Sequence, residues 1–319
     1  MRVVVTRRID SDTINMLKEH ADVTTWDSDL PPSREELIRL LGDADGALTL
    51  LTDRIDAELL DATPGLRAVS NLAVGYDNID VEACTKRLVA ACTTPDVLTR
   101  TTAEFTVALM FAVARQIVPA AIAAREGEWL TWYPFRFLGR DLEGATLGVV
   151  GLGRIGATVA TLMQGFGMRV IYADERSEST EFESATVTDL LRRADVVTLH
   201  VPLTPETRLM IDDEALASMK PDALLINTAR GGVIDTDALV RALERGRLGG
   251  VGLDVTDPEP LPVDHPLYGY ERVTIVPHIA SATSVTRHRM SSLAAQNLIA
   301  VLTGGDPPHC LNPEVLANA

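Results

Sequence analysis

Cysteine is scarce in this chain, which contains only Cys84, Cys92 and Cys310 among its 319 residues. An odd number leaves one cysteine unpaired in any scheme of internal disulfides, and no pair has the CxxC spacing of a redox or zinc motif. Reduced thiols in a cytosolic protein are therefore favoured over a disulfide framework. We expect a cytoplasmic protein without a metal site.

Long hydrophobic runs are also absent. The longest apolar stretch, Val107 to Ala114, ends at Arg115 and is typical of a buried helix. A membrane span needs ~18 apolar residues. The opening sequence MRVVVTRRID contains too short an apolar run for a signal peptide and has no small-residue cleavage pattern. The sequence thus predicts no membrane partner.

Positive charge is in short supply as well. Lysine and arginine number 29 against 45 aspartates and glutamates, which gives a formal net charge of −16. A protein that binds nucleic acid needs a basic surface to displace counterions, so this balance argues against a nucleic-acid partner. The simplest interpretation is an acidic surface that favours solubility. An acidic enzyme can still bind an anionic substrate in a locally basic pocket.

What the chain does contain is ample apolar sequence in an alternating order. Hydrophobic residues make up 46% of it, and its length corresponds to about two domains. Short β-branched runs alternate with helical patterns, which predicts an α/β protein with two Rossmann-like, doubly wound parallel sheets. Strands are expected at 3–6, 23–26, 47–51, 67–71, 88–91, 146–150, 169–173, 196–200, 223–227, 250–254 and 273–276.

Helices are expected between these strands, and two features of them can be checked closely. Ser33 and Glu36 have the spacing of a capping box at the start of the second helix. Pro119 should kink or end the first part of a long helical pattern at 101–124, which an irregular aromatic loop at 129–138 follows. The last helix is expected at 283–302.

The two α/β units have unequal roles in this interpretation. Residues 99–283 form a dinucleotide-binding domain, inserted between residues 1–98 and 284–319 of a substrate domain. Ligands bind beyond the carboxyl ends of parallel strands. The active site is therefore expected in a cleft between the two domains.

A glycine-rich fingerprint marks the cofactor site. Gly151, Gly153 and Gly156 follow a predicted strand and open a predicted helix, which is the context that a GxGxxG motif requires. Gly151 permits the tight turn, Gly153 lets the backbone approach a pyrophosphate, and Gly156 permits close helix–strand packing. The N–H groups around Arg154 and Ile155 would face the phosphates at the positive end of the helix. A glycine turn without a ligand is the less favoured alternative.

An acidic residue ends the next strand and bears on the choice of cofactor. Asp174 should accept hydrogen bonds from the ribose hydroxyls, and its carboxylate would repel a 2′-phosphate. Glu175 adds to this effect, whereas Arg176 could bind the extra phosphate. NAD is therefore favoured over NADP.

Three residues further along the chain can carry the reduction of a 2-oxo acid. The planar fork of Arg230 can bind the carboxylate and the carbonyl oxygen. His278 can deliver a proton, because an imidazole ordinarily titrates near ~6.5. Glu259 can fix the tautomer of that imidazole and favour its protonated form. Taken singly, these residues could be a surface ion pair, a solvated turn and a satisfied buried histidine. Behind a dinucleotide fingerprint they favour catalysis.

At these residues the chain resembles the D-isomer-specific 2-hydroxyacid dehydrogenases. The resemblance covers nearly the whole chain and rests on NLAVGYDNID, GLGRIG, VPLTPET, NTARGG, GLDVTDPEPLP and PHIASAT in this order. GEWLTWYP, LDVTDPEPLPVDHPL and MSSLAAQNLIAVL are similar to the glyoxylate/hydroxypyruvate reductase branch of the family.

The resemblance implies a flavodoxin-like substrate domain, a Rossmann cofactor domain and a fuller set of contacts. Backbone N–H groups of Val74 and Gly75 would bind the substrate carboxylate, and Ser281 would lie near the substrate or nicotinamide. The segment 101–134 would form a homodimer interface, with Trp132 reaching into the neighbouring active site. Dinucleotide contacts would come from Arg154, Ile155, Asp174, Pro202, Thr207, Thr228, Ala229, Arg230, Asp254, His278 and Ala280.

At two positions the chain departs from the family pattern, and there the resemblance implies less about the site and its substrate. Ala280 stands where the family often has glycine, and Val74 stands where phosphite dehydrogenases carry lysine. The leading hypothesis is a glyoxylate/hydroxypyruvate-type reductase that acts on a short 2-oxo acid. Another D-2-hydroxyacid dehydrogenase, such as a short phosphoglycerate dehydrogenase-like enzyme, is the main alternative. A dinucleotide-sensing binding protein is a third possibility.

Overall fold

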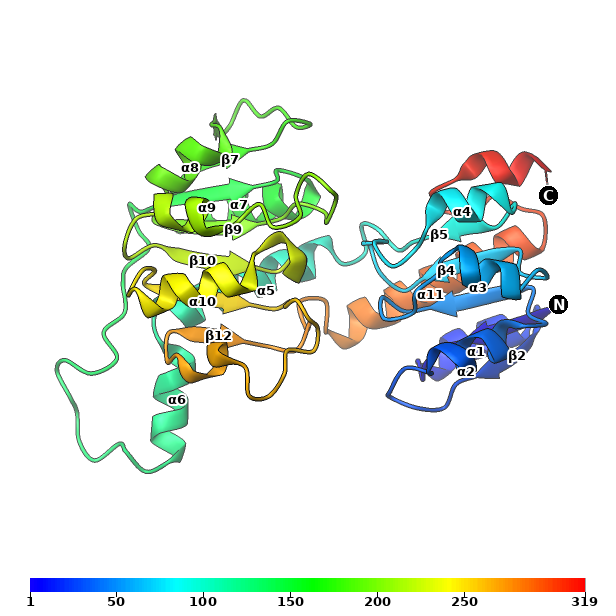
Figure 1. The fold of residues 1–319 in the computed structure, drawn as a ribbon, viewed down its shortest axis with the longest axis horizontal. Helices are drawn as coiled ribbons and strands as arrows, with labels where there is room; N and C mark the ends of the chain where they lie inside the picture. The colour runs from blue at the N-terminus through cyan, green and yellow to red at the C-terminus, as the bar shows by residue number, and fades with distance from the viewer. Residues whose placement is uncertain (319) are drawn as a thin grey trace. The chain divides into compact units, whose positions relative to one another are not determined.

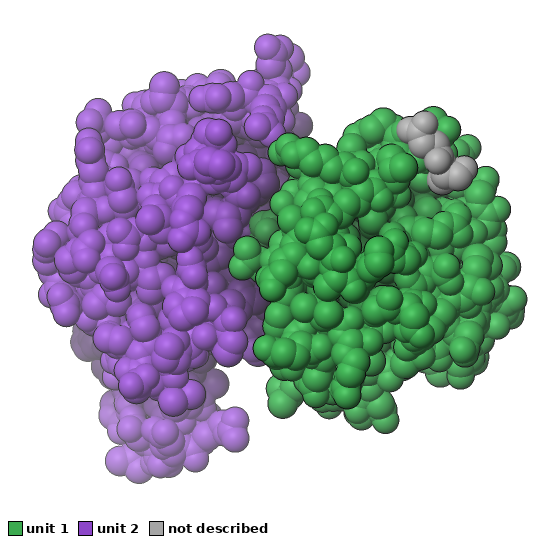
Figure 2. Space-filling model, turned by 45° about the vertical axis from the view of Figure 1, so that its right-hand side comes forward, with its two compact units in different colours: residues 1–98, 282–319 green, residues 99–281 purple. Residues whose placement is uncertain are grey.

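The structure is a computed structural model that describes residues 1–318. It divides into two compact units, residues 1–98 with 282–319 (unit 1) and residues 99–281 (unit 2), which are coloured separately in Figure 2. Unit 2 is inserted in the sequence of unit 1. The observed boundary at Ser281 lies two residues before the predicted one. Each unit is described by itself.

Unit 1 is built on a five-stranded parallel sheet in the order β2-β1-β3-β4-β5. This is the flavodoxin-like order, whose switch point lies between β1 and β3. Its strands are β1 (Arg2–Val5), β2 (Asp22–Thr25), β3 (Gly46–Thr49), β4 (Ala68–Asn71) and β5 (Ala90–Cys92). Its helices are α1 (Ser11–Lys18), α2 (Arg34–Leu41), α3 (Ala57–Ala62), α4 (Val81–Lys86) and α11 (Ser284–Leu302), with a final 3₁₀ segment η3 (Pro313–Asn318).

Helices cover the sheet of unit 1 in two groups. Apolar side chains of α2, α3 and α4 share one buried cluster with Val4, Ala47 and Val69 of the central strands. The last helix, α11, lies against β3, β4 and β5 and also contacts α1 (Figure 1). Ser33 and Glu36 form the predicted capping box at the start of α2, which is therefore confirmed.

Unit 2 is built on a seven-stranded sheet in the order β12-β11-β10-β9-β6-β7-β8, again with every pair parallel. Its strands are β6 (Thr146–Val150), β7 (Arg169–Ala173), β8 (Glu183–Ser184), β9 (Val196–Leu199), β10 (Leu224–Asn227), β11 (Gly250–Leu253) and β12 (Val273–Ile275). Its helices are α5 (Thr99–Ala114), α6 (Ile117–Arg125), α7 (Arg154–Gly165), α8 (Val187–Arg193), α9 (Asp213–Ser218) and α10 (Thr236–Glu244), with 3₁₀ segments η1 (Gly231–Val233) and η2 (Pro266–Gly269). The chain reverses its direction of winding between β6 and β9, and the predicted pair of doubly wound parallel sheets is confirmed.

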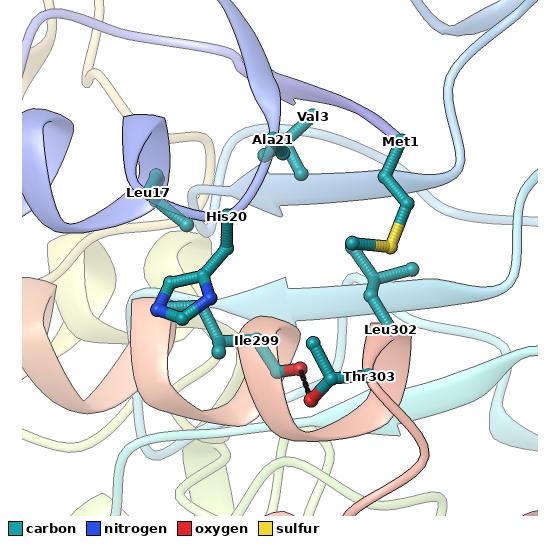
Figure 3. Close-up of a pocket in the computed structure, with 8 residues that line it drawn as sticks. All are labelled: Met1, Val3, Leu17, His20, Ala21, Ile299, Leu302 and Thr303. Carbon is teal, nitrogen blue, oxygen red and sulfur yellow. Dashed lines mark hydrogen bonds between the residues drawn. The ribbon is translucent and has the colours of Figure 1, made fainter.

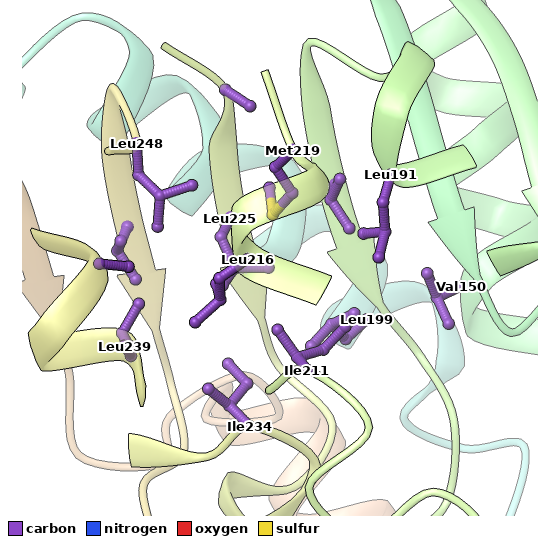
Figure 4. Close-up of a cluster of buried hydrophobic side chains, with 14 of the residues drawn as sticks. Val150, Leu191, Leu199, Ile211, Leu216, Met219, Leu225, Ile234, Leu239 and Leu248 are labelled. Carbon is purple, nitrogen blue, oxygen red and sulfur yellow. The ribbon is translucent and has the colours of Figure 1, made fainter. Parts of the chain in front are cut away.

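Two separate cores bury the faces of this second sheet. Helices α8, α9 and α10 cover one face, where Leu191, Leu216 and Leu239 pack on the strands (Figure 4). Helices α5 and α7 cover the other face in a second cluster. Val150 belongs to the first cluster and its neighbour Val149 to the second, as expected when successive side chains of a strand point to opposite faces.

The long helical pattern at 101–124 is where the prediction was wrong. The chain breaks before Pro119, at Gln116, whose φ of 51° is left-handed, and α5 and α6 meet at 65°. Pro119 lies in the first turn of α6, where a backbone N–H has no partner within the helix, so the proline ring is tolerated there. The short edge strand β8 was not predicted either, whereas the irregular loop at 129–138 is confirmed.

The helices were compared with the length and apolar composition that a membrane span needs. Within residues 1–318, no single helix is long and apolar enough to cross a membrane. The bent pair α5 and α6 meets the length and composition criteria together. Seven of the 16 residues of α5 are buried in unit 2, which is typical of a core helix.

Candidate active site

The candidate residues of unit 2 gather at one edge of its sheet. The glycine fingerprint follows β6, Asp174 follows β7, Arg230 follows β10, Asp254 follows β11, and His278 follows β12. Carboxyl ends of parallel strands share one edge, and the switch point between β6 and β9 is where such sheets bind nucleotides. Sequence positions more than a hundred residues apart are thereby brought to one edge.

The glycine turn leaves an open place in front of α7. Gly151 has a φ of +91°, and its N–H donates to the carbonyl oxygen of Ala173 at 2.9 Å. A Cβ on Gly156 would lie 2.1 Å from the carbonyl oxygen of Gly151, so this glycine is required for close packing. A Cβ on Gly153 would have no atom within 4 Å. The turn therefore combines a tight bend with open space at a helix N-terminus, which fits a pyrophosphate.

Asp174 is fixed beside this turn by the backbone. Its Oδ2 accepts the N–H of Leu152 and its Oδ1 accepts the N–H of Arg176, both at 2.7 Å. Each carboxylate oxygen has a second lone pair, so the side chain can still accept a hydroxyl group. This geometry suits a ribose next to the pyrophosphate and fits the dinucleotide that the fingerprint predicts.

His278 and Glu259 form the closest contact between predicted catalytic residues. Nδ1 of His278 lies 2.6 Å from Oε1 of Glu259, and both side chains are partly exposed. With Nδ1 engaged by the carboxylate, Nε2 is the nitrogen that can exchange a proton with a reactant. The arrangement is an imidazole oriented by an acid, as general acid–base catalysis requires.

Asp254 holds the segment that carries His278. The backbone N–H of His278 donates to the carbonyl oxygen of Asp254 at 2.9 Å. The carboxylate accepts the N–H groups of Ile279 at 2.7 Å and Ala280 at 3.0 Å. Burial raises the pKa of Asp254, and the two backbone hydrogen bonds oppose that rise. His278 has a left-handed φ of 53°, which is uncommon outside glycine, and these three bonds stabilise it.

Arg230 is placed by an asparagine that the sequence analysis did not single out. Asn227, the last residue of β10, donates from Nδ2 to the carbonyl oxygen of Arg230 at 2.9 Å and accepts the N–H of Ala229 at 3.0 Å. A Cβ on Gly231 would lie 2.0 Å from the backbone of Thr256, which pins the turn after the arginine. Asn227 lies at the end of a predicted strand, directly before the turn that carries Arg230. This position was the feature of the sequence that could have identified its role.

The remaining predicted cofactor residues lie in the same loops. Thr207 Oγ1 donates to the carbonyl oxygen of Pro202 at 2.6 Å, which fixes the loop after β9. Thr228 Oγ1 lies 2.8 Å from Thr106 Oγ1, and this pair anchors the start of the arginine turn to α5. Ser281 is buried at the end of unit 2. The roles of these residues toward cofactor and substrate stay predictions.

Val74 and Gly75 lie in unit 1, in the loop after β4. Asn71, the last residue of β4, donates from Nδ2 to the carbonyl oxygen of Gly75 and to Oδ1 of Asn78, both at 3.1 Å. Asn78 in turn donates to the carbonyl oxygen of Asp53 at 2.8 Å, which ties this loop to the one after β3. Within residues 1–318, the N–H groups of Val74, Gly75 and Tyr76 donate no hydrogen bond. Such a row of N–H groups suits an anion.

Trp132 is set apart from the residues above. It lies in the loop after α6 and is 81% exposed. Its predicted role depends on a second subunit.

Two other histidines have hydrogen-bond partners in the structure. His265 Nδ1 accepts the N–H of Leu267 at 3.3 Å and caps η2. His288 Nδ1 lies 3.1 Å from Oδ1 of Asp10, the N-cap of α1. His20 lines an apolar depression in unit 1, at the ends of α1 and α11 (Figure 3). This depression contains none of the candidate residues.

His200, which follows β9, provides a prediction about acid stability. Burial lowers the pKa of its imidazole to about 4, and its Nε2 lies 3.0 Å from Thr198 Oγ1. In the unfolded chain the ring titrates near ~6.5, so the unfolded state takes up a proton first as the pH falls. Stability is complete above the unfolded pKa and is lost as the pH falls toward the folded one. The loss between pH 7 and pH 5 should be about 2 kcal/mol.

The measurement is the free energy of unfolding by urea at these two pH values, for the wild type and for His200→Gln. Glutamine keeps a hydrogen-bonding group near Thr198 but does not titrate, so the variant should lose less stability on acidification by about that amount. Equal losses in both proteins would show that another group dominates the acid response.

Comparisons with known proteins give a family match and similar proteins of nearly the same length. Residues 107–280 match the family described as D-isomer specific 2-hydroxyacid dehydrogenase, NAD binding domain. The chain is 48% identical to a glyoxylate reductase of Korarchaeum cryptofilum over 99% of this chain and 97% of that protein.

Two solved structures show the same fold. The TT0316 protein of Thermus thermophilus has a TM-score of 0.94 at 46% identity and covers 98% of this chain and 100% of its own. An NADPH-dependent glyoxylate/hydroxypyruvate reductase of Sinorhizobium meliloti, in complex with NADP and malonate, has a TM-score of 0.86 at 30% identity. It covers 97% of this chain and 96% of its own.

Proposed function

Because the chain belongs to the D-isomer specific 2-hydroxyacid dehydrogenase family, we propose that it reduces glyoxylate, hydroxypyruvate or a similarly short 2-oxo acid with NADH. That it is an NAD(P)-dependent oxidoreductase of 2-hydroxy acids follows from the family. The single observation that carries the proposal is the 2.6 Å contact between His278 and Glu259 at the edge of the sheet where the dinucleotide fingerprint lies. The names of the similar reductases support the choice of substrate.

Residues of the chain bind the substrate, polarise its carbonyl group and donate a proton. Bound NADH supplies the hydride that reduces C2 of the oxo acid. Arg230 binds the substrate carboxylate and polarises the carbonyl oxygen, which gains negative charge as it is reduced. Nε2 of protonated His278 donates its proton to that oxygen, and Glu259 stabilises the charged imidazole before the transfer. In this proposal Val74 and Gly75 of unit 1 donate backbone N–H groups to the carboxylate.

A panel of 2-oxo acids tests the proposal. Initial rates with glyoxylate, hydroxypyruvate, phosphohydroxypyruvate and longer oxo acids are measured with NADH and with NADPH. We expect the highest kcat/KM for glyoxylate or hydroxypyruvate with NADH. A preference for phosphohydroxypyruvate would favour the phosphoglycerate dehydrogenase-like alternative. NADH binding without turnover of any oxo acid would favour a dinucleotide-sensing protein.

The preference for NADH gives a second prediction, centred on Asp174. A 2′-phosphate near this carboxylate would meet a like charge, which costs about 1–2 kcal/mol after screening by solvent and salt. Asp174→Ala should therefore change the ratio of kcat/KM for NADPH and NADH by about 5- to 30-fold in favour of NADPH. The measurement is that ratio at a fixed concentration of glyoxylate.

Two matched variants separate the charge from the hydrogen bonds. Asp174→Asn removes the charge but keeps an acceptor for the N–H of Leu152, so it should retain most of the change in ratio. Glu175→Ala alters the exposed neighbouring acid and should change the ratio less. If Asp174→Asn left both cofactors at wild-type efficiency, repulsion by Asp174 would not explain the preference.

We also propose that the enzyme is a cytoplasmic homodimer. Helix α6 and the loop after it project from unit 2 (Figure 1) and expose a series of large apolar side chains. Ile117, Ile122, Trp129, Leu130, Trp132 and Phe135 are all at least half exposed. Apolar patches of this kind mark protein interfaces. Sedimentation should give twice the chain mass of 34.4 kDa, and a monomer at micromolar concentration would contradict the proposal.

A further inference from the structure

Two of the three cysteines face each other across strands in unit 1, far in sequence from the catalytic residues assigned above. Cys92, the last residue of β5, and Cys310, in the C-terminal tail, form an antiparallel bridge. The flanking hydrogen bond runs from the N–H of Leu311 to the carbonyl oxygen of Ala91 at 2.7 Å. The cysteines therefore form a non-hydrogen-bonded pair, in which Cα atoms lie ~4.5 Å apart. A disulfide needs a Cα separation of about 4.4–6.8 Å.

The two thiols also differ in a way that suits stepwise oxidation. Cys92 is completely buried, whereas Cys310 is half-buried. A hydrogen bond from the Cys92 thiol lowers the pKa of Cys310 from its ordinary value. The same bond and burial raise the pKa of Cys92. Cys310 is thus the accessible nucleophile, and Cys92 is held beside it as a resolving thiol.

We propose that Cys92 and Cys310 form a site of reversible disulfide formation by small-molecule disulfides such as oxidised glutathione. Cys310 as thiolate attacks one sulfur of the oxidised glutathione, and the other leaves as glutathione thiolate. The thiol of Cys92 then loses its proton and attacks Sγ of Cys310, which expels the second glutathione thiolate. Two protein thiols are oxidised and one glutathione disulfide is reduced to two thiols.

The surrounding contacts favour this bond over other fates of the thiols. Asn312 binds the tail to β5 and its neighbours, accepting the N–H of Ala91 at 2.8 Å and donating to the carbonyl oxygen of Val89 at 2.9 Å. The cysteines are thus already opposed before oxidation, so a disulfide needs little rearrangement. Cys84 is buried separately, with a pKa that burial raises to about 12, and should not compete.

The disulfide would change the stability of the enzyme more than its chemistry. All of unit 2 lies between Cys92 and Cys310 in the sequence. The new bond would close a loop that contains this whole unit and restrict the unfolded chain strongly. We expect Tm to rise by roughly 5–10 °C on oxidation. Neither cysteine belongs to the candidate active site, so kcat should change little.

The experiment uses the full-length protein, reduced and then equilibrated with defined mixtures of reduced and oxidised glutathione. Free thiols are blocked after quenching, and peptide mapping by mass spectrometry locates any bond. We expect one intramolecular Cys92–Cys310 disulfide, formed in the wild type and in Cys84→Ser and reversed by excess reduced glutathione. Cys92→Ser should instead accumulate a glutathione adduct on Cys310.

Three results would overturn the proposal. One is a stable glutathione adduct on Cys310 in the wild type, since it would show that Cys92 does not resolve it. Another is a protein that remains reduced in oxidised glutathione alone. The third is a bond that includes Cys84. If Cys92→Ser fails to fold, peptide mapping of the wild type and of Cys310→Ser still tests the proposal, because Cys92 is present in both proteins. An unchanged Tm on oxidation would contradict the stabilising role.

Discussion

His278→Ala should lower kcat for reduction of the oxo acid by about 10²–10⁴-fold, while NADH binding changes only a few-fold. Without the imidazole, the chain after β12 loses the group that would give a proton to the alkoxide as it forms. Glu259 cannot replace it, because its carboxylate contacts the side of the ring opposite Nε2. The measurements are steady-state oxidation of NADH with glyoxylate and NADH affinity by fluorescence titration.

A second variant, His278→Asn, distinguishes the loss of the proton donor from the effect of backbone strain at residue 278. Residue 278 has a left-handed φ of 53°, which alanine adopts poorly and asparagine tolerates better. His278→Asn should therefore unfold at nearly the wild-type temperature and still lose turnover. If this variant kept wild-type kcat, His278 would not be the acid, and the contact with Glu259 would be structural.

The two sheets were predictable because their signals are local. Strands β6 and β7 have the predicted bounds, since β-branched runs end at glycine or aspartate there. Helix α8 also has its predicted bounds, because Thr186 caps it and Ala194 ends it. Patterns of this kind depend on neighbours within a few residues. They therefore survive without knowledge of the tertiary structure.

The break at Gln116 shows what local patterns miss. The helical pattern runs through it without interruption, and only proline offered a visible cause. In the structure Gln116 Nε2 donates to the carbonyl oxygen of Leu138 at 2.5 Å, so the turn is stabilised by a loop 22 residues away. Tertiary contacts of this range override helical propensity and cannot be inferred from composition.

In the candidate site, too, some residues were predictable from local sequence and others were not. Its candidate catalytic residues were predicted from motifs, because arginine, glutamate and histidine have few alternatives for this chemistry. The residues that hold them were less visible. Asp254 was predicted only as a dinucleotide contact, yet its carboxylate accepts the backbone N–H groups of Ile279 and Ala280, 25 and 26 residues away. The links made by Asn71 and Asn78 also join separate loops. Such roles emerge only when strand ends are placed side by side.

Replacing Arg230 should produce the second large effect. Arg230→Ala removes the fork that would bind the carboxylate and the carbonyl oxygen, and truncation of a desolvated charge pair costs about 2–5 kcal/mol. We expect kcat/KM for glyoxylate to fall by about 30- to 5000-fold, with a lower kcat and a higher KM. Arg230→Lys keeps the charge but not the planar pair of donors, so it should recover only part of this loss.

Two further measurements distinguish recognition of the substrate from a structural role of the arginine. Guanidinium added to Arg230→Ala should restore part of the turnover, because the cavity left by the side chain accepts the same planar cation. It should not restore His278→Asn. Arg208, a half-exposed arginine 3.9 Å from Asp257, provides the matched control, and Arg208→Ala should keep kcat/KM within a few-fold of the wild type. Equal losses in the two alanine variants would mean that the general positive charge of these loops, and not the fork of Arg230, attracts the substrate anion.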